Sequence, residues 1–161
     1  MSIRNANRDD ILVLLEIIRK SFRDVTVRFG ITQENCPRST AFYTKERLEE
    51  DFGKGKSYYL LEDDGHLCGC VGVERADGQV CYLQRLGVLS EYRGKGFGEV
   101  LVRHVFKEAK DTGMKRVEIG IISKDMRLKG WYEKLGFVSK GTKEFDHLPF
   151  LVEFMFKELC E

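Results

Sequence analysis

The chain has 161 residues and a mass of 18.6 kDa, which fits a single domain, residues 1–161, with room for a buried core. Hydrophobic residues make up 42% and charged residues 33%, a composition typical of a folded protein and not of a disordered one. The 27 basic and 26 acidic residues nearly cancel, so no broad charged surface is expected to attract nucleic acid or an anionic membrane. No apolar stretch has the length of a membrane span or of a secretory signal, which predicts a cytoplasmic protein.

Cysteine and histidine usage gives no sign of a metal or disulfide framework. The five cysteines include no C-x-x-C pair and are expected to be reduced, mostly buried thiols; they are Cys36, Cys68, Cys70, Cys81 and Cys160. Cys68 and Cys70 share one face of a predicted strand, which fits small core side chains better than a metal or redox pair. The three histidines are scattered without a second ligand at zinc-site spacing, so no metal is predicted.

The N-terminal part predicts a strand and two helices around an irregular segment. Residues 2–6 are expected to form a short strand, and a helix opens near residues 7–10 because apolar residues then recur every three or four positions. Residues 23–43 have no clean period and are expected to form an ordered wall or lid. Thr44 is suited to cap a short helix that runs through Phe52.

From residue 57 the hydrophobic period changes to two, which is typical of strands. Strands are expected at 57–61, 68–74 and 80–88, and the turn signals Asp64-Gly65 and Asp77-Gly78 favour antiparallel hairpins between them. The result is a meander.

The C-terminal part alternates helices and strands. A helix is expected from Phe97 to near Gly113, a buried strand at 116–122 and a helix over 126–135. Two more strands follow near 137–141 and 150–156. The fold class is therefore α/β, with a mixed, mostly antiparallel sheet of about seven strands and helices on both faces.

The segment with the clearest chemical meaning is the glycine-rich turn between a strand and a helix, with the sequence L-G-V-L-S-E-Y-R-G-K-G-F-G at 86–98. The first amides of a helix lack internal partners, and the positive end of the helix dipole favours an anion. Glycines at 94, 96 and 98 let a phosphate approach the backbone, and Arg93 and Lys95 add two cations. We therefore expect a polyphosphate ligand here.

Two common phosphate-binding motifs are excluded by spacing. A Walker loop requires G-x-x-x-x-G-K-[ST], and no lysine in this turn is followed by Ser or Thr. The dinucleotide fingerprint G-x-G-x-x-G fails because Glu99 stands three residues after Gly96, and the preceding strand belongs to a meander.

These residues resemble the GNAT-type N-acetyltransferase family. The family motif R/Q-x-x-G-x-G/A matches Arg93, Gly96 and Gly98 within Y-R-G-K-G-F-G, and the segment G-W-Y-E-K-L-G-F at 130–137 resembles the family's Y-E-K-L-G-F. The order of predicted elements resembles the family fold over nearly the whole chain. The resemblance implies a sheet splayed between its fourth and fifth strands and a single acetyltransferase domain.

The resemblance implies acetyl-CoA as the acetyl donor. Its pyrophosphate would lie on the amides of the turn, and its pantetheine would run along the strand as though it were an added strand. The cofactor-binding residues implied are Leu86, Gly87, Val88, Arg93, Gly94, Lys95, Gly96, Phe97, Gly98 and Asp125. Because backbone groups make the pantetheine contacts, side-chain substitutions at 86–88 are expected to matter little.

Catalytic roles follow from the same resemblance. Tyr132 matches the family's general acid, which protonates the coenzyme A thiolate, although an aromatic in the helix core is the alternative. The family often holds a carboxylate on the fourth strand, where this chain has Tyr82 and Gln84. Glu74 on the neighbouring strand is the candidate base, against the simpler interpretation of a solvated charge at a hairpin end. Asp125 stands where the family commonly has Asn; it either alters cofactor affinity or caps the helix at Met126.

The expected activity is direct transfer of an acetyl group to a primary amine of a small molecule. Acidic residues that could attract a cationic amine are Glu34, Glu49, Glu50, Asp51 and Asp146. A protein N-terminus or lysine is an alternative acceptor, and a non-catalytic acyl-CoA-binding module is an alternative function. No nucleic-acid or membrane partner is expected, and a homodimer is left open.

Overall fold

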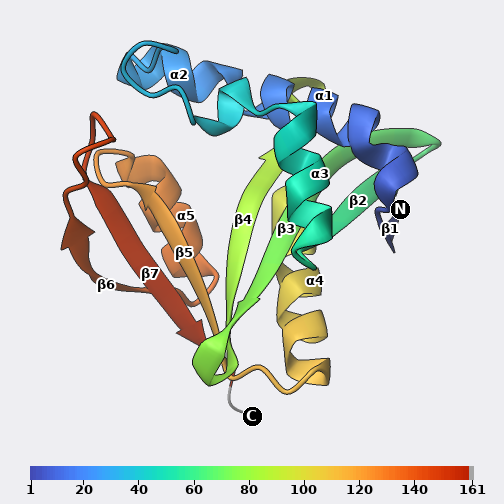
Figure 1. Ribbon diagram of the computed structural model, residues 1–161. Helices are drawn as coiled ribbons and strands as arrows, with labels where there is room; N and C mark the ends of the chain where they lie inside the picture. Colours follow the sequence, from blue (N-terminus) through green and yellow to red (C-terminus); the bar gives the residue numbers. More distant parts are fainter. Residues whose placement is uncertain (160–161) are drawn as a thin grey trace. The chain divides into compact units, whose positions relative to one another are not determined.

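The computed structural model describes residues 1–159, which group into two compact units. The first unit contains residues 1–74 and 83–105, and the second contains residues 75–82 and 106 onward. Each unit is described by itself below, with the elements labelled in Figure 1. The expectation of one domain spanning residues 1–161 stays a prediction.

Seven strands are hydrogen-bonded in the order β1-β2-β3-β4-β5-β7-β6. Their bounds are β1 Ser2–Asn5, β2 Ser57–Asp63, β3 His66–Ala76, β4 Val80–Val88, β5 Arg116–Ile122, β6 Val138–Lys143 and β7 Val152–Glu158. Only β4 and β5 pair in parallel among the strand pairs whose register the structure describes. The mixed, mostly antiparallel sheet predicted from the sequence is confirmed.

The parallel pair is short. Its register joins Val80 to Arg116 and Tyr82 to Glu118, within the second unit. The later residues of β4, from Leu83 to Val88, belong to the first unit. The parallel register described for β4 and β5 ends at Tyr82, before the end of β4, which fits the splay that the sequence predicted between the fourth and fifth strands.

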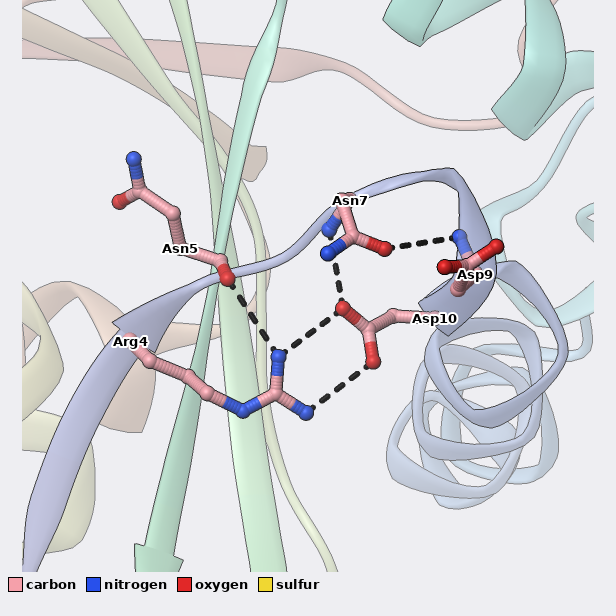
Figure 2. Close-up of polar contacts among 5 residues, drawn as sticks. All are labelled: Arg4, Asn5, Asn7, Asp9 and Asp10. Carbon is pink, nitrogen blue, oxygen red and sulfur yellow. Dashed lines mark hydrogen bonds and ion pairs between the residues drawn. The ribbon is translucent and has the colours of Figure 1, made fainter.

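The N-terminal strand and the first helical segment are joined by a compact set of polar contacts (Figure 2). The Asn7 side-chain oxygen accepts from the Asp9 amide at 2.8 Å, and the Asp10 carboxylate accepts from the Asn7 amide at 2.9 Å. The Arg4 guanidinium donates to both Asp10 oxygens, at 2.9 and 3.0 Å. This reciprocal capping satisfies amides that a helix start leaves unpaired, where residues 7–10 predicted the helix to open.

In the first unit, α1 (Ile11–Ser21) and α3 (Lys45–Gly53) pack against the sheet strands β2 and β3. The core that they share contains buried apolar and aromatic side chains, namely Ile11, Leu14, Ile17, Ile18, Tyr43, Leu48, Tyr58, Leu60 and Cys70. Thr44 caps α3 as predicted, because its hydroxyl accepts from the Arg47 amide at 3.2 Å.

The segment that lacked a hydrophobic period is more regular than expected. It contains α2 (Arg23–Phe29), which ends at Gly30 in the left-handed conformation with φ of +63°, and a short helical turn at Thr40–Phe42. None of the α2 residues is fully buried, and a helix of seven residues is too short to show a clear hydrophobic period in the sequence. Whether this segment acts as a lid stays a prediction.

In the second unit, β7 lies between β5 and β6 and pairs antiparallel with both. The helix α5 (Met126–Lys134) connects β5 to β6, as Figure 1 shows. The long helix α4 (Phe97–Asp111) begins in the first unit and ends in the second. All three C-terminal strands were predicted, with β6 and β7 displaced by one or two residues.

The cysteine prediction is confirmed for four residues, since Cys36, Cys68, Cys70 and Cys81 are buried free thiols. Burial raises the pKa of Cys70 to about 12 and that of Cys81 to about 11, so both remain protonated. Cys160 lies outside the described residues. Over residues 1–159, no helix is long and apolar enough to cross a membrane, and no three His, Cys, Asp or Glu side chains are placed to hold a metal ion.

Candidate functional site

The glycine-rich turn forms an exposed loop at the start of a long helix. Gly94 and Gly96 have φ of +80° and +84°, in the left-handed region that side chains other than glycine disfavour. A Cβ atom at either position would meet no protein atom within 4 Å, so the space above this backbone is open. Phe97 is buried and anchors the first turn of α4. The first amides of α4 therefore lie beside an accessible loop, as an anion site requires.

Arg93 connects this loop to the end of α1 and the start of α2. Its Nε donates to the Val88 carbonyl at 2.9 Å, and its two terminal nitrogens donate to the Ser21 carbonyl at 2.8 Å and to Asp24 at 3.1 Å. The sequence suggested Arg93 as a cation for phosphate, and the structure adds a second role, because its guanidinium bonds three protein acceptors. Lys95 is exposed, with its Nζ 5.8 Å from the centre of the Tyr92 ring.

The strand leading into the loop is more constrained than the sequence indicated. The Val88 carbonyl accepts from Arg93, so one backbone group of the predicted pantetheine strand is already bonded. Gly87 is buried, and a Cβ atom there would lie 2.6 Å from the Cβ of Ser21. Gly87 is therefore an exception to the expectation that substitutions at 86–88 matter little. Leu86 is half-buried.

Tyr132 lies in α5 of the second unit and is 5% exposed. Its ring makes edge contacts with Trp131 and Phe137, with centroids 4.9 and 5.2 Å away. Burial raises the pKa of its hydroxyl, so the phenol keeps its proton at neutral pH. Within residues 1–159 the hydroxyl forms no hydrogen bond to the protein, so both packing and proton donation are compatible with this geometry.

Asp125 caps α5. It is buried, and its Oδ1 accepts from the Leu128 amide at 3.2 Å, which satisfies one amide of the first turn. The capping alternative for Asp125 is confirmed, and a contribution to cofactor affinity stays a prediction.

Glu74 is part of a polar chain in the first unit. Its Oε1 accepts from Gln84 Nε2 at 2.9 Å and lies 3.5 Å from Lys56 Nζ. The carboxylate is therefore bonded and ion-paired, not a charge surrounded by water alone. Lys56 also lies 3.4 Å from the buried Asp51.

Of the acidic residues considered for an amine, Asp51 is the only one with a buried side chain in the described part of the chain. The hydroxyls of Tyr43 and Tyr58 donate to Asp51 at 2.5 and 2.7 Å. Burial alone would raise its pKa, but these two hydroxyls and the positive charges of Arg85 and Lys56 hold it below the usual value. The other four acids are exposed: Glu34, Glu49, Glu50 and Asp146.

Sequence reasoning missed Arg85, which lies inside β4 with φ of +50°. Its guanidinium lies over the Tyr43 ring, 4.5 Å from the ring centre, and Arg47 lies 4.0 Å from the same centre. A charged residue between the apolar positions of the strand sequence L-Q-R-L was the available signal.

Comparisons with known proteins agree with the resemblance seen in the sequence. The Acetyltransferase (GNAT) family profile matches residues 15–137. An uncharacterized N-acetyltransferase of Mycobacterium tuberculosis is 34% identical over 82 residues, which is 51% of this chain and 53% of that protein. The chain thus spans about half the length of this relative. An uncharacterized N-acetyltransferase of Escherichia coli is 26% identical over 124 residues, 74% of each chain.

Solved structures share the fold at low identity. The ribosomal-protein-S18-alanine N-acetyltransferase of Escherichia coli superposes with a TM-score of 0.78 at 13% identity, covering 99% of this chain and 94% of that one. A Salmonella typhimurium protein solved with its cofactor acetyl-CoA has a TM-score of 0.73 at 20% identity, covering 100% and 95%. A chimera of the Vibrio cholerae spermidine N-acetyltransferase has a TM-score of 0.74 at 16% identity, covering 98% and 95%. With the family profile spanning most of its length, the chain belongs to the acetyltransferase (GNAT) family.

Proposed function

We propose that the protein transfers the acetyl group of acetyl-CoA to the primary amine of a small molecule. The observation that carries this proposal is the exposed loop at the start of α4, where Gly94 and Gly96 adopt positive φ beside the free amides of a 15-residue helix. Family membership supports the choice of acetyl-CoA over other polyphosphates.

The residues of the loop fit a pyrophosphate. The amides from Gly94 to Gly98 can donate to its oxygens, and the exposed Lys95 supplies a charge that no protein carboxylate neutralises in the described part of the chain. Arg93 contributes mainly by fixing the loop, through its bonds to Val88, Ser21 and Asp24. Leu86, Gly87 and Val88 are proposed to bind the pantetheine arm through their remaining backbone groups.

Acetyl-CoA supplies an activated acyl group whose thiol is a fair leaving group. An alkylamine with a pKa of about 10.4 loses its proton at pH 7 at a cost of about 4.6 kcal/mol. Releasing a thiol with a pKa near 8.5 as its thiolate at pH 7 costs only about 2 kcal/mol relative to the protonated thiol. Deprotonating the amine is therefore the harder requirement, and protonating the thiolate the easier one.

We propose that Tyr132 is the general acid, which donates a proton to the departing coenzyme A thiolate. Its buried hydroxyl keeps its proton at neutral pH and bonds no protein acceptor among the described residues, so that proton is not committed to another group of the protein. Glu74 is the proposed base, acting through water, because Lys56 and Gln84 already contact its carboxylate. Asp125 contributes by capping the helix that carries Tyr132.

Two other functions remain as alternatives. One is acetylation of a protein N-terminus or lysine, in line with a structural neighbour named for the alanine of a ribosomal protein. The other is acyl-CoA binding without catalysis. We further propose a cytosolic location, supported by the four free thiols among the described residues.

Release of free coenzyme A, measured with a panel of amines, polyamines, amino acids and peptides, tests the proposal. Turnover with a small amine is the expected result. Tight binding of acetyl-CoA without turnover on any amine would favour the binding module, and turnover with peptides alone would favour the protein acceptor.

A further inference from the structure

Arg85 has an unusual backbone conformation for its place in the fold. Asp64, Gln79 and Arg85 are the described residues other than glycine with positive φ; Asp64 lies in a turn and Gln79 in the short 3-10 helix between β3 and β4. Arg85 lies within β4, where φ of +50° interrupts the regular strand. Strained residues of this kind persist where the surrounding structure holds them, and they concentrate at functional sites.

The guanidinium of Arg85 is hydrogen-bonded through Nη1, whereas its Nε has no acceptor in the described part of the chain. Its Nη1 donates to Gln84 Oε1 at 2.8 Å, and its plane lies over Tyr43. Its Nε is shielded from solvent and has no hydrogen-bond partner within residues 1–159. Nε and Nη2 lie on the same edge of a guanidinium, the edge that binds a carboxylate through two parallel hydrogen bonds. A buried donor without an acceptor is destabilising, and an acceptor group on a ligand would remove that cost.

Positive charge is in excess around Tyr43. Burial first, and then the nearby charges of Arg38 and Arg85, lower the pKa of Arg47, whereas Tyr43 and Asp51 act in the opposite direction. The guanidinium of Arg47 lies over the same ring as that of Arg85. Neither Arg47 nor Arg85 forms an ion pair with a carboxylate of the described chain. An anionic group of a ligand would relieve this repulsion.

The two carboxylates nearby are already bonded. Asp51 accepts from Tyr43 and Tyr58 and pairs with Lys56, and Glu74 accepts from Gln84 and pairs with Lys56. A polycationic acceptor would thus meet three arginines and no unpaired carboxylate in this cluster. The charge pattern favours an acceptor that carries a negative group.

We propose that the acceptor is a small amine bearing a carboxylate, such as an amino acid, and that Arg85 binds this carboxylate through Nε and Nη2. Arg85 is then a specificity-determining residue for the acetyl transfer proposed above, on which this inference rests. Arg47, whose guanidinium also lies over the Tyr43 ring, adds positive charge beside Arg85. A carboxylate on Arg85 also gives the buried Nε an acceptor.

The test compares each of the common L-amino acids with its carboxamide as acceptor, alongside spermidine and a peptide that begins with alanine, by release of coenzyme A. We expect kcat/KM for the preferred amino acid to exceed that of its carboxamide by about 10- to 100-fold, the range of a hydrogen-bonded charge. The carboxamide has the more readily deprotonated amine, so a lower rate cannot come from amine protonation.

Variants assign the preference to Arg85. Arg85→Met should raise KM for the amino acid by about 10- to 100-fold and change the carboxamide little. Arg85→Lys should recover part of the loss, because lysine keeps the charge without the planar fork. The matched control Arg103→Met removes an exposed arginine of α4 that pairs with Glu99, and it should leave the preference unchanged. Binding of the N-acetylated product, measured by calorimetry, should weaken in parallel in Arg85→Met.

Equal rates for amino acid and carboxamide, or an equal loss for both in Arg85→Met, would overturn the inference. If Arg85→Met does not fold, the wild-type comparison and Arg85→Lys still decide. Transfer to spermidine or to the peptide alone would refute the carboxylate acceptor and keep acetyl transfer. Absence of acetyl-CoA binding, or of transfer to every amine, would instead refute the proposed function, and the inference with it.

Discussion

Replacing Gly96 with valine separates the conformational role of the loop from its role in binding. Gly96 has φ of +84°, and a left-handed backbone costs a residue with a side chain about 1–2 kcal/mol. In a protein of this size that lowers the melting temperature by roughly 2–8 °C. A Cβ atom at Gly96 meets no protein atom within 4 Å, so the added side chain occupies the space above the loop amides.

Because the valine side chain occupies the space above the loop amides, the binding free energy of acetyl-CoA should fall by more than the unfolding free energy does. Loss of one or two amide contacts to the pyrophosphate predicts a 10- to 100-fold rise in Kd, equal to about 1.4–2.7 kcal/mol. Titration calorimetry on the folded variant measures this change.

The matched control is Gly113→Val, because Gly113 has nearly the same φ, +83°, and the same open surroundings. It follows the other end of α4 and should lower stability by a similar amount while leaving acetyl-CoA affinity unchanged. An unchanged Kd in Gly96→Val, or an equal rise of Kd in both variants, would refute the phosphate-binding role of the loop.

Three further predictions concern the second unit. Tyr132→Phe keeps the ring and removes the hydroxyl, so kcat should fall about 10- to 100-fold with acetyl-CoA affinity nearly unchanged; a loss of affinity equal to the loss of rate would indicate packing instead. Asp125→Ala removes the cap of α5 and should lower the unfolding free energy by about 1 kcal/mol in denaturant titrations, whereas Asp125→Asn, which keeps an acceptor, should not. The Ser139 hydroxyl and the Lys129 ammonium lower the pKa of the buried Glu153, so the stability that this carboxylate contributes is present above its ordinary pKa and is lost as pH falls through the lowered value. Below about pH 5 the wild type should therefore lose stability faster than Glu153→Gln, and parallel curves from pH 7 to 3 would contradict this account.

Most of the helices and strands could be predicted because caps, turn residues and hydrophobic periods involve residues that are close together in the sequence. Thr44 stands one residue before a helix and caps it, and the 86–98 segment shows its strand, its turn glycines and its helix in the order in which they fold. The helix α2 gave no signal, because seven residues without a fully buried side chain are too few to show a hydrophobic period.

The candidate site also contains residues that the sequence indicated and residues that only the structure brought to attention. The glycines of the loop and the segment containing Tyr132 were visible because family motifs are contiguous in sequence. Arg85 lies in β4, far along the chain from Tyr43 and Arg47 near the start of α3, and no spacing rule connects it to them.

The sequence by itself predicted the family, the element order and the proposed phosphate-binding loop, since each depends on residues that are neighbours in the chain. Only the tertiary structure decided which charges are already bonded. It shows that Arg93 is hydrogen-bonded to Ser21, that Asp51 accepts from two tyrosine hydroxyls, and that the buried Nε of Arg85 has no acceptor among the described residues. Hydrogen-bond partners of side chains are set by packing between distant segments, and packing is a property of the folded chain.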